Sequence, residues 1–200
     1  MTSSDQPSLI LASGSPRRRD LLLQAGIRFE VCPAGIPEVG LPGESPVAFA
    51  ERLARDKALA VARRFGPSPP RLVLAADTIV VVDDEVLGKP RDEDHALELL
   101  ERLTGRSHSV VTAVALAASD TLRIRQTSAE SRVTMRAADR DELRAYVATG
   151  ESMDKAGGYA VQGGARSFVT RILGSETNVI GLPLEETLDL LGAAGFGSTV

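Results

Sequence analysis

Residues 72–82 read Leu-Val-Leu-Ala-Ala-Asp-Thr-Ile-Val-Val-Val, an apolar run with a single carboxylate, Asp77, at its middle. The length and β-branched content predict a strand, and the following residues 83–85 (Asp-Asp-Glu) predict a turn. An ionised carboxylate in such a strand is costly unless it is paired or bound to a cation. Asp77 is therefore a candidate for binding Mg²⁺ or for accepting a proton from an attacking water. The alternative is a turn between two shorter strands, where Asp is common.

Strands and helices are both expected around this run. Apolar segments predict strands at 9–13, 28–32, 108–118 and 122–136, of which the last two form an antiparallel hairpin. Periodicity and boundary residues predict helices that begin at Ser15-Pro16 and end at Gly26, and at 45–65, 92–103, 139–149 and 183–194. The stretch 150–181 is rich in glycine and contains a short apolar segment at 167–173. This order predicts an α/β or α+β protein with a mixed sheet.

Composition excludes several functional classes. The 200 residues are 43% hydrophobic and 25% charged, as in ordinary globular proteins. A formal net charge of −4 argues against general binding to nucleic acids or anionic membranes. One cysteine, Cys32, forms no intramolecular disulfide and agrees with a reducing compartment; it lies in the apolar stretch FEVCPAG and is expected to be a small buried hydrophobic residue. The polar N-terminus, MTSSDQPS, is not a secretory signal, and the longest apolar run is about half a membrane span. We therefore expect a cytoplasmic protein without nucleic-acid or membrane partners.

A cluster of cations lies where a helix is expected to begin. Residues 13–19 read Ser-Gly-Ser-Pro-Arg-Arg-Arg. A helix N-terminus already carries partial positive charge, so three arginines in the first turn are unfavourable for the isolated helix. A bound polyphosphate would explain them, because Gly14 permits close approach and the arginines neutralise charge. The alternative is a solvated basic turn.

Two lysines are further candidates. Lys57 lies on the inward stripe of its predicted helix, at i, i+4 spacing from Leu53 and Val61; a lysine that snorkels from the core edge is the alternative. Lys89 stands between Gly88 and Pro90 in a loop after a strand, where a fixed charge could meet phosphate.

A glycine-rich segment near the C-terminal end completes the set. It reads Asp-Lys-Ala-Gly-Gly-Tyr over 154–159 and Gln-Gly-Gly over 162–164, and Asn178 follows in TNVIGLPL. Glycine lets backbone approach a ligand, and the Gln162 carboxamide can both donate and accept. A flexible surface loop is the alternative. The two histidines, His95 and His108, show no metal-binding spacing and are expected to be structural or exposed.

Six tracts resemble, in order, those of the Maf family of nucleoside triphosphate pyrophosphatases. They are LILASGSPRRRDLL, ARDKA, LAADTIVVVDDEVLGKP, LLERLTGRSHSVVTAVAL, MDKAGGYAVQGGA and TNVIGLPLEET. The resemblance runs from about residue 9 to 191. It implies a single domain over 1–200, with residues 1–8 as a disordered N-terminal extension. The implied fold is α/β, a mixed twisted sheet with flanking helices and two lobes around a deep cleft, similar to inosine triphosphate pyrophosphatases. A homodimer is also implied.

The resemblance also implies roles for individual residues. The catalytic carboxylate falls on Asp77, and a divalent cation, Mg²⁺ or Mn²⁺, would be held by Asp77 and Glu38. The position before Glu38 is frequently acidic in the family and is Pro37 here. The phosphate-binding positions are Ser13, Arg17, Arg18, Lys57 and Lys89. The positions that set substrate specificity are Arg17, Thr78 and Gln162.

The tract DKAGGYAVQG resembles the subgroup that acts on dTTP and UTP. The expected reaction is attack of water on the α-phosphorus, giving the monophosphate and pyrophosphate and so removing surplus or non-standard nucleotides. Two alternatives stay open: hydrolysis of 7-methyl-GTP or another modified nucleotide, and a nucleotide-responsive regulator of septum formation, a role with which the family has been associated. A nucleic-acid binder is disfavoured by the acidic balance and the scarcity of aromatics.

Overall fold

The computed structural model describes residues 8–196. Its strands are β1 (Ser8–Leu11), β2 (Glu30–Val31), β3 (Arg71–Val82), β4 (Glu85–Leu87), β5 (Ser107–Ala118), β6 (Ile124–Met135) and β7 (Val169–Leu173). Its α-helices are α1 (Pro16–Gln24), α2 (Pro46–Phe65), α3 (Glu93–Leu103), α4 (Arg140–Val147), α5 (Glu176–Ile180) and α6 (Leu184–Ala193). Two short 3-10 helices are η1 (Ala156–Gly158) and η2 (Gly164–Phe168). No helix in this range is long and apolar enough to cross a membrane.

The seven strands form one mixed sheet. Their order is β2-β1-β3-β5-β6-β7, and β4 pairs with β3 outside this path. β1 is parallel to both β2 and β3, whereas β3–β4 and β6–β7 are antiparallel pairs. The parallel pairs need crossover connections, which α1 and α2 supply. The expected mixed sheet with flanking helices is confirmed.

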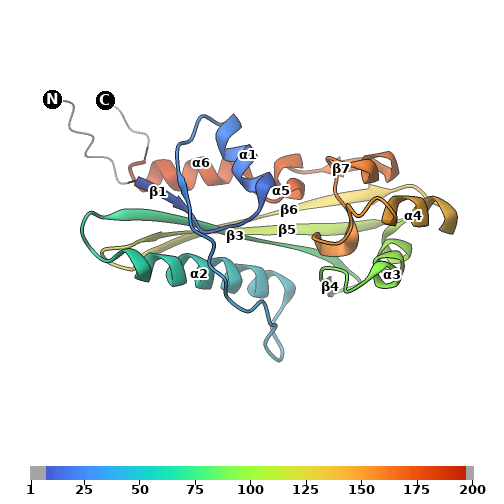
Figure 1. Ribbon diagram of the computed structural model, residues 1–200, viewed down its shortest axis with the longest axis horizontal. Helices are drawn as coiled ribbons and strands as arrows, with labels where there is room; N and C mark the ends of the chain where they lie inside the picture. The colour runs from blue at the N-terminus through green and yellow to red at the C-terminus, as the bar shows by residue number, and fades with distance from the viewer. Residues whose placement is uncertain (1–7, 197–200) are drawn as a thin grey trace. The chain divides into compact units, whose positions relative to one another are not determined.

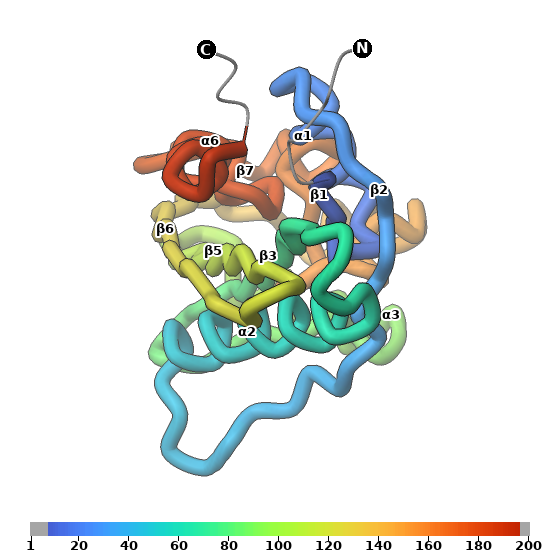
Figure 2. The backbone as a smooth tube through the Cα atoms, turned by 90° about the vertical axis from the view of Figure 1, so that its left-hand side faces the viewer, coloured from blue at the N-terminus to red at the C-terminus, as the bar shows by residue number. Residues whose placement is uncertain are grey.

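The chain divides into two compact units. Unit 1 consists of residues 1–77, 113–128 and 181–200, and unit 2 of residues 78–112 and 129–180. The boundary in β3 falls between Asp77 and Thr78. In unit 1, α2 covers one face of the sheet, and α1 and α6 lie on the other (Figures 1 and 2). In unit 2, α3 contacts both α4 and η1, and its core is built from apolar residues of these helices and of β3, β5 and β6.

Helix boundaries follow the predicted signals closely. Ser45 caps α2 by accepting a hydrogen bond from Ala48 N at 3.3 Å, and Pro46 is its first residue. Asp139 and Glu142 form a capping box at α4. Ser15 precedes Pro16 of α1 as expected, but its side chain makes no cap hydrogen bond. Local polar signals therefore place the helices even where the capping bond itself is not made.

Several local expectations need correction. The predicted strand at 28–32 is only the two residues Glu30–Val31, because short parallel pairing to β1 is all that supports it. Cys32, expected to be buried, is partly exposed. Ser8 already belongs to β1, so it is not part of an extension; residues 1–7 of that predicted extension lie outside the described residues. Within 150–181, expected to be a glycine-rich stretch, the structure has η1, η2, β7 and α5, which tertiary contacts stabilise.

A buried polar pair connects β5 to the glycine-rich segment within unit 2. His108 Nε2 lies 2.7 Å from the Tyr159 hydroxyl, and the rings meet edge to face with centroids 5.3 Å apart. Both residues are buried. Burial, with a smaller contribution from the charge of Arg106, lowers the pKa of His108 to about 4. Burial likewise raises the pKa of the Tyr159 hydroxyl. His108 is thus a neutral structural histidine at physiological pH, in agreement with expectation.

The depressed pKa of His108 predicts a specific acid sensitivity. The folded state binds the proton only near pH 4, whereas the unfolded chain binds it near pH 6.5. Above about pH 6.5 both states carry a neutral His108, and the free energy of unfolding is at its full value. As the pH falls from 6.5 to about 4, the unfolded chain takes up the proton first, and the free energy of unfolding decreases by about 3 kcal/mol. His108→Gln removes this titration. We therefore expect the free energy of unfolding of wild type to approach that of the variant as the pH falls from about 7 to about 4. Urea unfolding across this range measures it, and a difference that does not vary with pH would contradict the assignment.

Candidate functional site

The ammonium group of Lys57 connects two carboxylates in unit 1. Its Nζ lies 2.7 Å from Asp77 Oδ1 and 2.5 Å from Glu38 Oε1. The side chains of Lys57 and Asp77 are 11% and 8% exposed, whereas that of Glu38 is 43% exposed. The three charges therefore form a cluster that is buried on the Asp77 side and reaches solvent on the Glu38 side.

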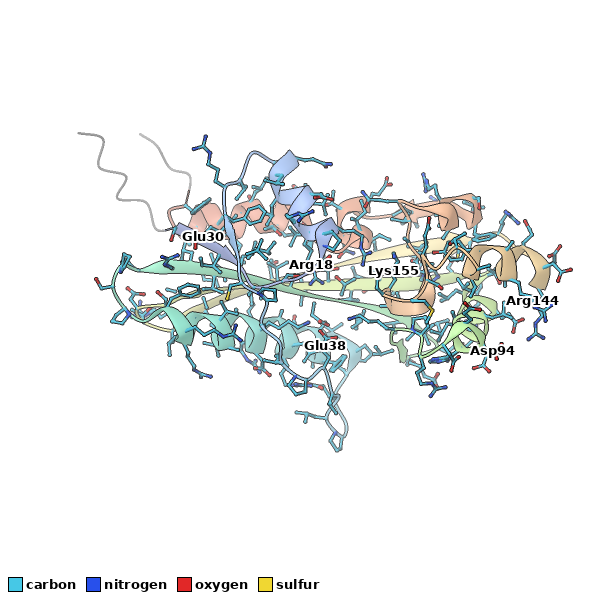
Figure 3. The ribbon with its side chains drawn as sticks, viewed as in Figure 1. Arg18, Glu30, Glu38, Asp94, Arg144 and Lys155 are labelled. Carbon is cyan, nitrogen blue, oxygen red and sulfur yellow. The ribbon has the colours of Figure 1, made fainter. Side chains whose placement is uncertain are left out.

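Three different elements bring these side chains together. Lys57 projects from the buried face of α2, on the same stripe as Leu53 and Val61. Asp77 lies in the middle of β3, among buried alanines and valines. Glu38 comes from the loop 33–45, which has no helix or strand of its own (Figure 3). The helix thus supplies the cation that a buried carboxylate in an apolar strand requires, and the loop adds a second carboxylate to the same ammonium group.

The cluster has the donor chemistry of a magnesium or manganese site. Two carboxylates and one ammonium leave one formal negative charge, and each oxygen is a hard ligand. Among residues 8–196, no group of three or more His, Cys, Asp and Glu side chains is arranged to hold a metal. Mg²⁺ needs no such cage, because it is usually held by one or two carboxylates, waters and substrate phosphates. Asp77 and Glu38 fit that pattern.

Arg18 extends the charged cluster from α1. Its Nε donates to Gly181 O at 2.8 Å, and one terminal nitrogen donates to Ser13 Oγ at 3.2 Å. Burial lowers the pKa of Arg18, and the negative charge of Asp77 partly offsets that effect, with a smaller contribution from Glu38. The guanidinium is therefore held close enough to feel both carboxylates. Ser13 and Arg18, both predicted to bind phosphate, are in direct contact.

The three consecutive arginines have different environments. Arg18 is held as described, Arg17 is partly buried beside it, and the exposed Arg19 pairs with Asp20 at 3.5 Å. Ser13 Oγ also accepts from Ser15 N at 3.2 Å, which shapes the turn before α1. The first turn of the helix thus presents ordered polar groups rather than a uniformly solvated basic surface.

Lys89 belongs to unit 2, in the loop that follows β4. Gly88 O accepts a hydrogen bond from Gly157 N at 3.0 Å. A Cβ atom added at Gly158 would lie 3.5 Å from Pro90 Cγ, so the two segments pack closely. Lys89 itself is exposed. The tracts GKP and DKAGG, far apart in sequence, are therefore neighbours in space.

The segment around Gln162 is fastened on both sides. Three hydrogen bonds do this: between Tyr159 and His108, from Ala160 N to Tyr146 Oη at 3.2 Å, and from Gly164 N to Glu151 Oε2 at 2.8 Å. The Gln162 carboxamide is exposed and makes no hydrogen bond to any residue in the described range. An ordered backbone thus presents a carboxamide whose donor and acceptor are available to a ligand.

Thr78 and Asn178 are linked in the interior of unit 2. Thr78 Oγ1 lies 2.9 Å from Thr112 Oγ1, which donates to Asn178 O at 3.0 Å. The fully buried Asn178 side chain donates to Val110 O and Ser131 Oγ. Asn178 therefore has a structural role and is not presented to a ligand. Thr78 directly follows Asp77 in the sequence, so it is the residue of this hydrogen-bonded series that is nearest in sequence to the carboxylate cluster.

Arg52 and Glu44 belong to no motif that the sequence offers, yet they are in direct contact. Their side chains form a two-pronged ion pair, with nitrogen–oxygen distances of 2.6 and 2.8 Å. Arg52 is five residues before Lys57 on α2, and Glu44 precedes that helix. Opposite charges near the start of α2 were the one signal that could have suggested this ion pair. Such charges usually belong to a solvent-exposed helix face, so the signal is weak.

The family model described as "Maf-like protein" matches residues 8–194. A protein of Myxococcus xanthus named dTTP/UTP pyrophosphatase is 49% identical over 195 residues, which cover 96% of this chain and 95% of the relative. A protein of the same name from Geobacter sulfurreducens is 48% identical, covering 94% and 96%.

Solved structures also resemble the chain. A HAM1 protein from Coxiella burnetii has 17% sequence identity and a TM-score of 0.46, covering 94% of this chain and 99% of that one. A dITP/XTP pyrophosphatase from Mycobacterium abscessus has 18% identity and a TM-score of 0.40, covering 64% and 74%. The match of the family model to nearly the whole chain, together with relatives near 50% identity, identifies the protein as a member of the Maf-like family.

Proposed function

We propose that this protein hydrolyses dTTP and UTP to the corresponding monophosphate and pyrophosphate. The observation that carries the proposal is the Lys57 cluster with Asp77 and Glu38, close to Arg18 and its partner Ser13. Relatives that are 48–49% identical over nearly the whole chain are named dTTP/UTP pyrophosphatases. A mixed set of carboxylates and cations suits a substrate that carries both phosphate charge and a bound divalent ion.

The cations of the chain would bind and orient the triphosphate. Arg17 and Arg18 supply planar forks for phosphate oxygens, and Ser13 lies beside them. A lysine ammonium has three N–H donors, and Lys57 directs two of them to carboxylates, so the third is available to a phosphate oxygen. Lys89 on its exposed loop would add a further positive charge. Together these groups would offset charge that builds up on the leaving pyrophosphate.

Asp77 is the group we assign to the reacting water. Its carboxylate would accept the water proton as the oxygen attacks the α-phosphorus, the bond to the bridging oxygen of the leaving pyrophosphate breaks, and the nucleoside monophosphate remains. A divalent cation held by Asp77 and Glu38 would neutralise phosphate charge. The Lys57 ammonium would hold the two carboxylates close to each other, because its positive charge offsets their mutual repulsion.

Gln162 is the residue we assign to recognition of the base. The uracil or thymine edge presents an N–H beside carbonyl acceptors, and a carboxamide can pair with both. Cytosine reverses the order of donor and acceptor, and a freely rotating carboxamide could turn over to match it. Discrimination therefore requires neighbouring groups to hold the carboxamide in one orientation, so that the wrong base leaves a polar group unpaired at a cost of about 1–3 kcal/mol. Arg17 and Thr78 would complete the recognition of the substrate. Thr78 is oriented by Thr112, so its hydroxyl has a defined position.

We also propose that the enzyme works in the cytoplasm and as a homodimer. The reaction needs a pool of nucleoside triphosphates, and a chain with one cysteine suits a reducing compartment. Light scattering on the purified protein measures the oligomeric state.

Replacing the central carboxylate tests the catalytic assignment. Asp77→Asn keeps the shape of the side chain but loses the charge that would hold a cation and accept a proton, so turnover should be abolished while the fold is retained. The matched control is Asp84→Asn, an exposed turn residue at φ +61°, a conformation that Asn tolerates. Steady-state kinetics and circular dichroism give both readouts. Turnover by the Asp77 variant within about tenfold of wild type, less than removal of one transition-state interaction typically costs, would contradict the role.

The products and the metal dependence test the reaction type. Hydrolysis of dTTP should give dTMP and pyrophosphate in equal amounts, and EDTA should stop it until Mg²⁺ or Mn²⁺ is restored. Chromatography of the reaction mixture measures both. Orthophosphate with dTDP would mean attack at the γ-phosphorus and would rule out the proposed orientation of the triphosphate.

A nucleotide panel tests the specificity. Wild type should hydrolyse dTTP and UTP at comparable kcat/KM, CTP more slowly, and ATP and GTP hardly at all. Gln162→Glu should weaken this preference because a carboxylate cannot donate a hydrogen bond, and Gln162→Ala should weaken it by removing both functions. The assay includes 7-methyl-GTP, and its appearance as the best wild-type substrate would overturn the assignment of the base while leaving the pyrophosphatase chemistry intact.

A further inference from the structure

The loop that carries Glu38 is fastened to α2 by the guanidinium of Arg52. Arg52 Nε donates to Glu44 Oε1 at 2.6 Å, and one terminal nitrogen donates to Glu44 Oε2 at 2.8 Å. The same terminal nitrogen donates to Val39 O at 2.8 Å. One guanidinium thus holds the loop at two points, one of them the carbonyl of the residue next to Glu38.

The contacts of Glu44 close this part of the loop. Glu44 Oε2 accepts from Leu41 N at 3.1 Å, and Glu44 N donates to Leu41 O at 3.1 Å. The side chains of Arg52 and Glu44 are only 18% and 11% exposed, and the guanidinium lies 5.5 Å from the centre of the Phe49 ring. The Arg52 guanidinium lowers the pKa of Glu44, and the carboxylate in return raises the pKa of Arg52. Two hydrogen bonds and low exposure constrain this pair more than an ordinary surface ion pair.

The position of Glu38 depends on contacts made by its loop rather than on regular secondary structure. Its loop forms no strand or helix, and its side chain is 43% exposed. At one end it contacts the Lys57 ammonium, and one residue later the backbone is held by Arg52, both from the same helix. Two successive anchor points on one rigid helix fix where the Glu38 carboxylate lies relative to Asp77.

We propose that Arg52 is a positioning residue that sets the affinity of the Asp77–Glu38 pair for a divalent cation by holding the Glu38 loop in place. This inference rests on the proposed function, because it takes Glu38 as a cation ligand. Arg52 touches neither carboxylate of the cluster, so it acts on cation binding and not on the chemical step. Only an arginine can do this, because the fork reaches Glu44 and the Val39 carbonyl together, whereas a lysine offers a single charged point.

Direct binding of Mn²⁺ in the absence of nucleotide tests the proposal. The signal of free Mn²⁺ in electron paramagnetic resonance gives the dissociation constant for wild type, Arg52→Lys, Arg52→Gln and Glu44→Gln. Each variant should bind Mn²⁺ roughly 10- to 100-fold more weakly, as is typical when a group that orients a metal ligand is lost. The Mn²⁺ concentration for half-maximal dTTP hydrolysis should rise in parallel, while kcat at saturating Mn²⁺ stays near the wild-type value. The matched control is Arg55→Lys, on the same helix with a 43% exposed side chain, which should change neither.

A double-mutant cycle separates positioning from general stabilisation. In a Glu38→Gln background the ligand is already lost, so Arg52→Lys should weaken Mn²⁺ binding no further. The same additional loss in that background, or unchanged Mn²⁺ affinity in the Arg52 and Glu44 variants, would overturn the proposal. A lower melting temperature with unchanged Mn²⁺ affinity would also overturn it, and Glu44→Gln supplies this comparison with the least change in shape.

Failure of the proposed function gives a different result. It would appear in the wild-type protein itself, as absence of dTTP hydrolysis at any Mn²⁺ concentration. If wild type hydrolyses dTTP and binds Mn²⁺ while the Arg52 variants match it in both, only the positioning role is refuted.

Discussion

The burial of one carboxylate in an apolar strand is the constraint on which the rest of the site depends. Asp77 lies in β3 with 8% of its side chain exposed, and an unpaired charge there would be strongly destabilising. Lys57 from α2 provides the compensating ammonium, and Glu38 shares it from a loop. The need to compensate the buried charge of Asp77 thus fixes the positions of all three charged groups. The same contacts hold the helix, the strand and the loop together.

In unit 2, the glycine-rich segment that carries Gln162 contains only short helices and is held in place by contacts with other elements. The glycine-rich segment is held by the buried pair of His108 and Tyr159 and by the backbone contact between Gly157 and Gly88. Gly157 has φ +68°, a conformation that favours glycine, and a Cβ atom there would lie 3.1 Å from Val80 Cγ1 and crowd that side chain. The glycines that suggest flexibility in the sequence instead allow close packing.

Secondary structure was predicted well where signals are local. β3 and α2 extend within one residue of expectation, because a continuous apolar run and a Ser-Pro helix start act over a few residues. The segment 150–181 was predicted poorly. Its elements, such as the five-residue α5, are too short to be stable alone and depend on contacts with residues far away in the chain, such as that between Asn178 and Ser131.

The sequence by itself determined which chemistry is available: a carboxylate that needs a partner at position 77, cations at the start of α1, a lysine on the inward face of α2, and a family whose motifs recur in order. Only the tertiary structure decided which of these groups meet. It directed Lys57 to two carboxylates, turned Arg18 toward Ser13 and Gly181, committed Asn178 to the core, and brought in Arg52 and Glu44, which no motif had marked. The physical reason is that a charge on a helix face has many acceptable partners, and the choice among them is made by the packing of distant segments, which local sequence does not encode.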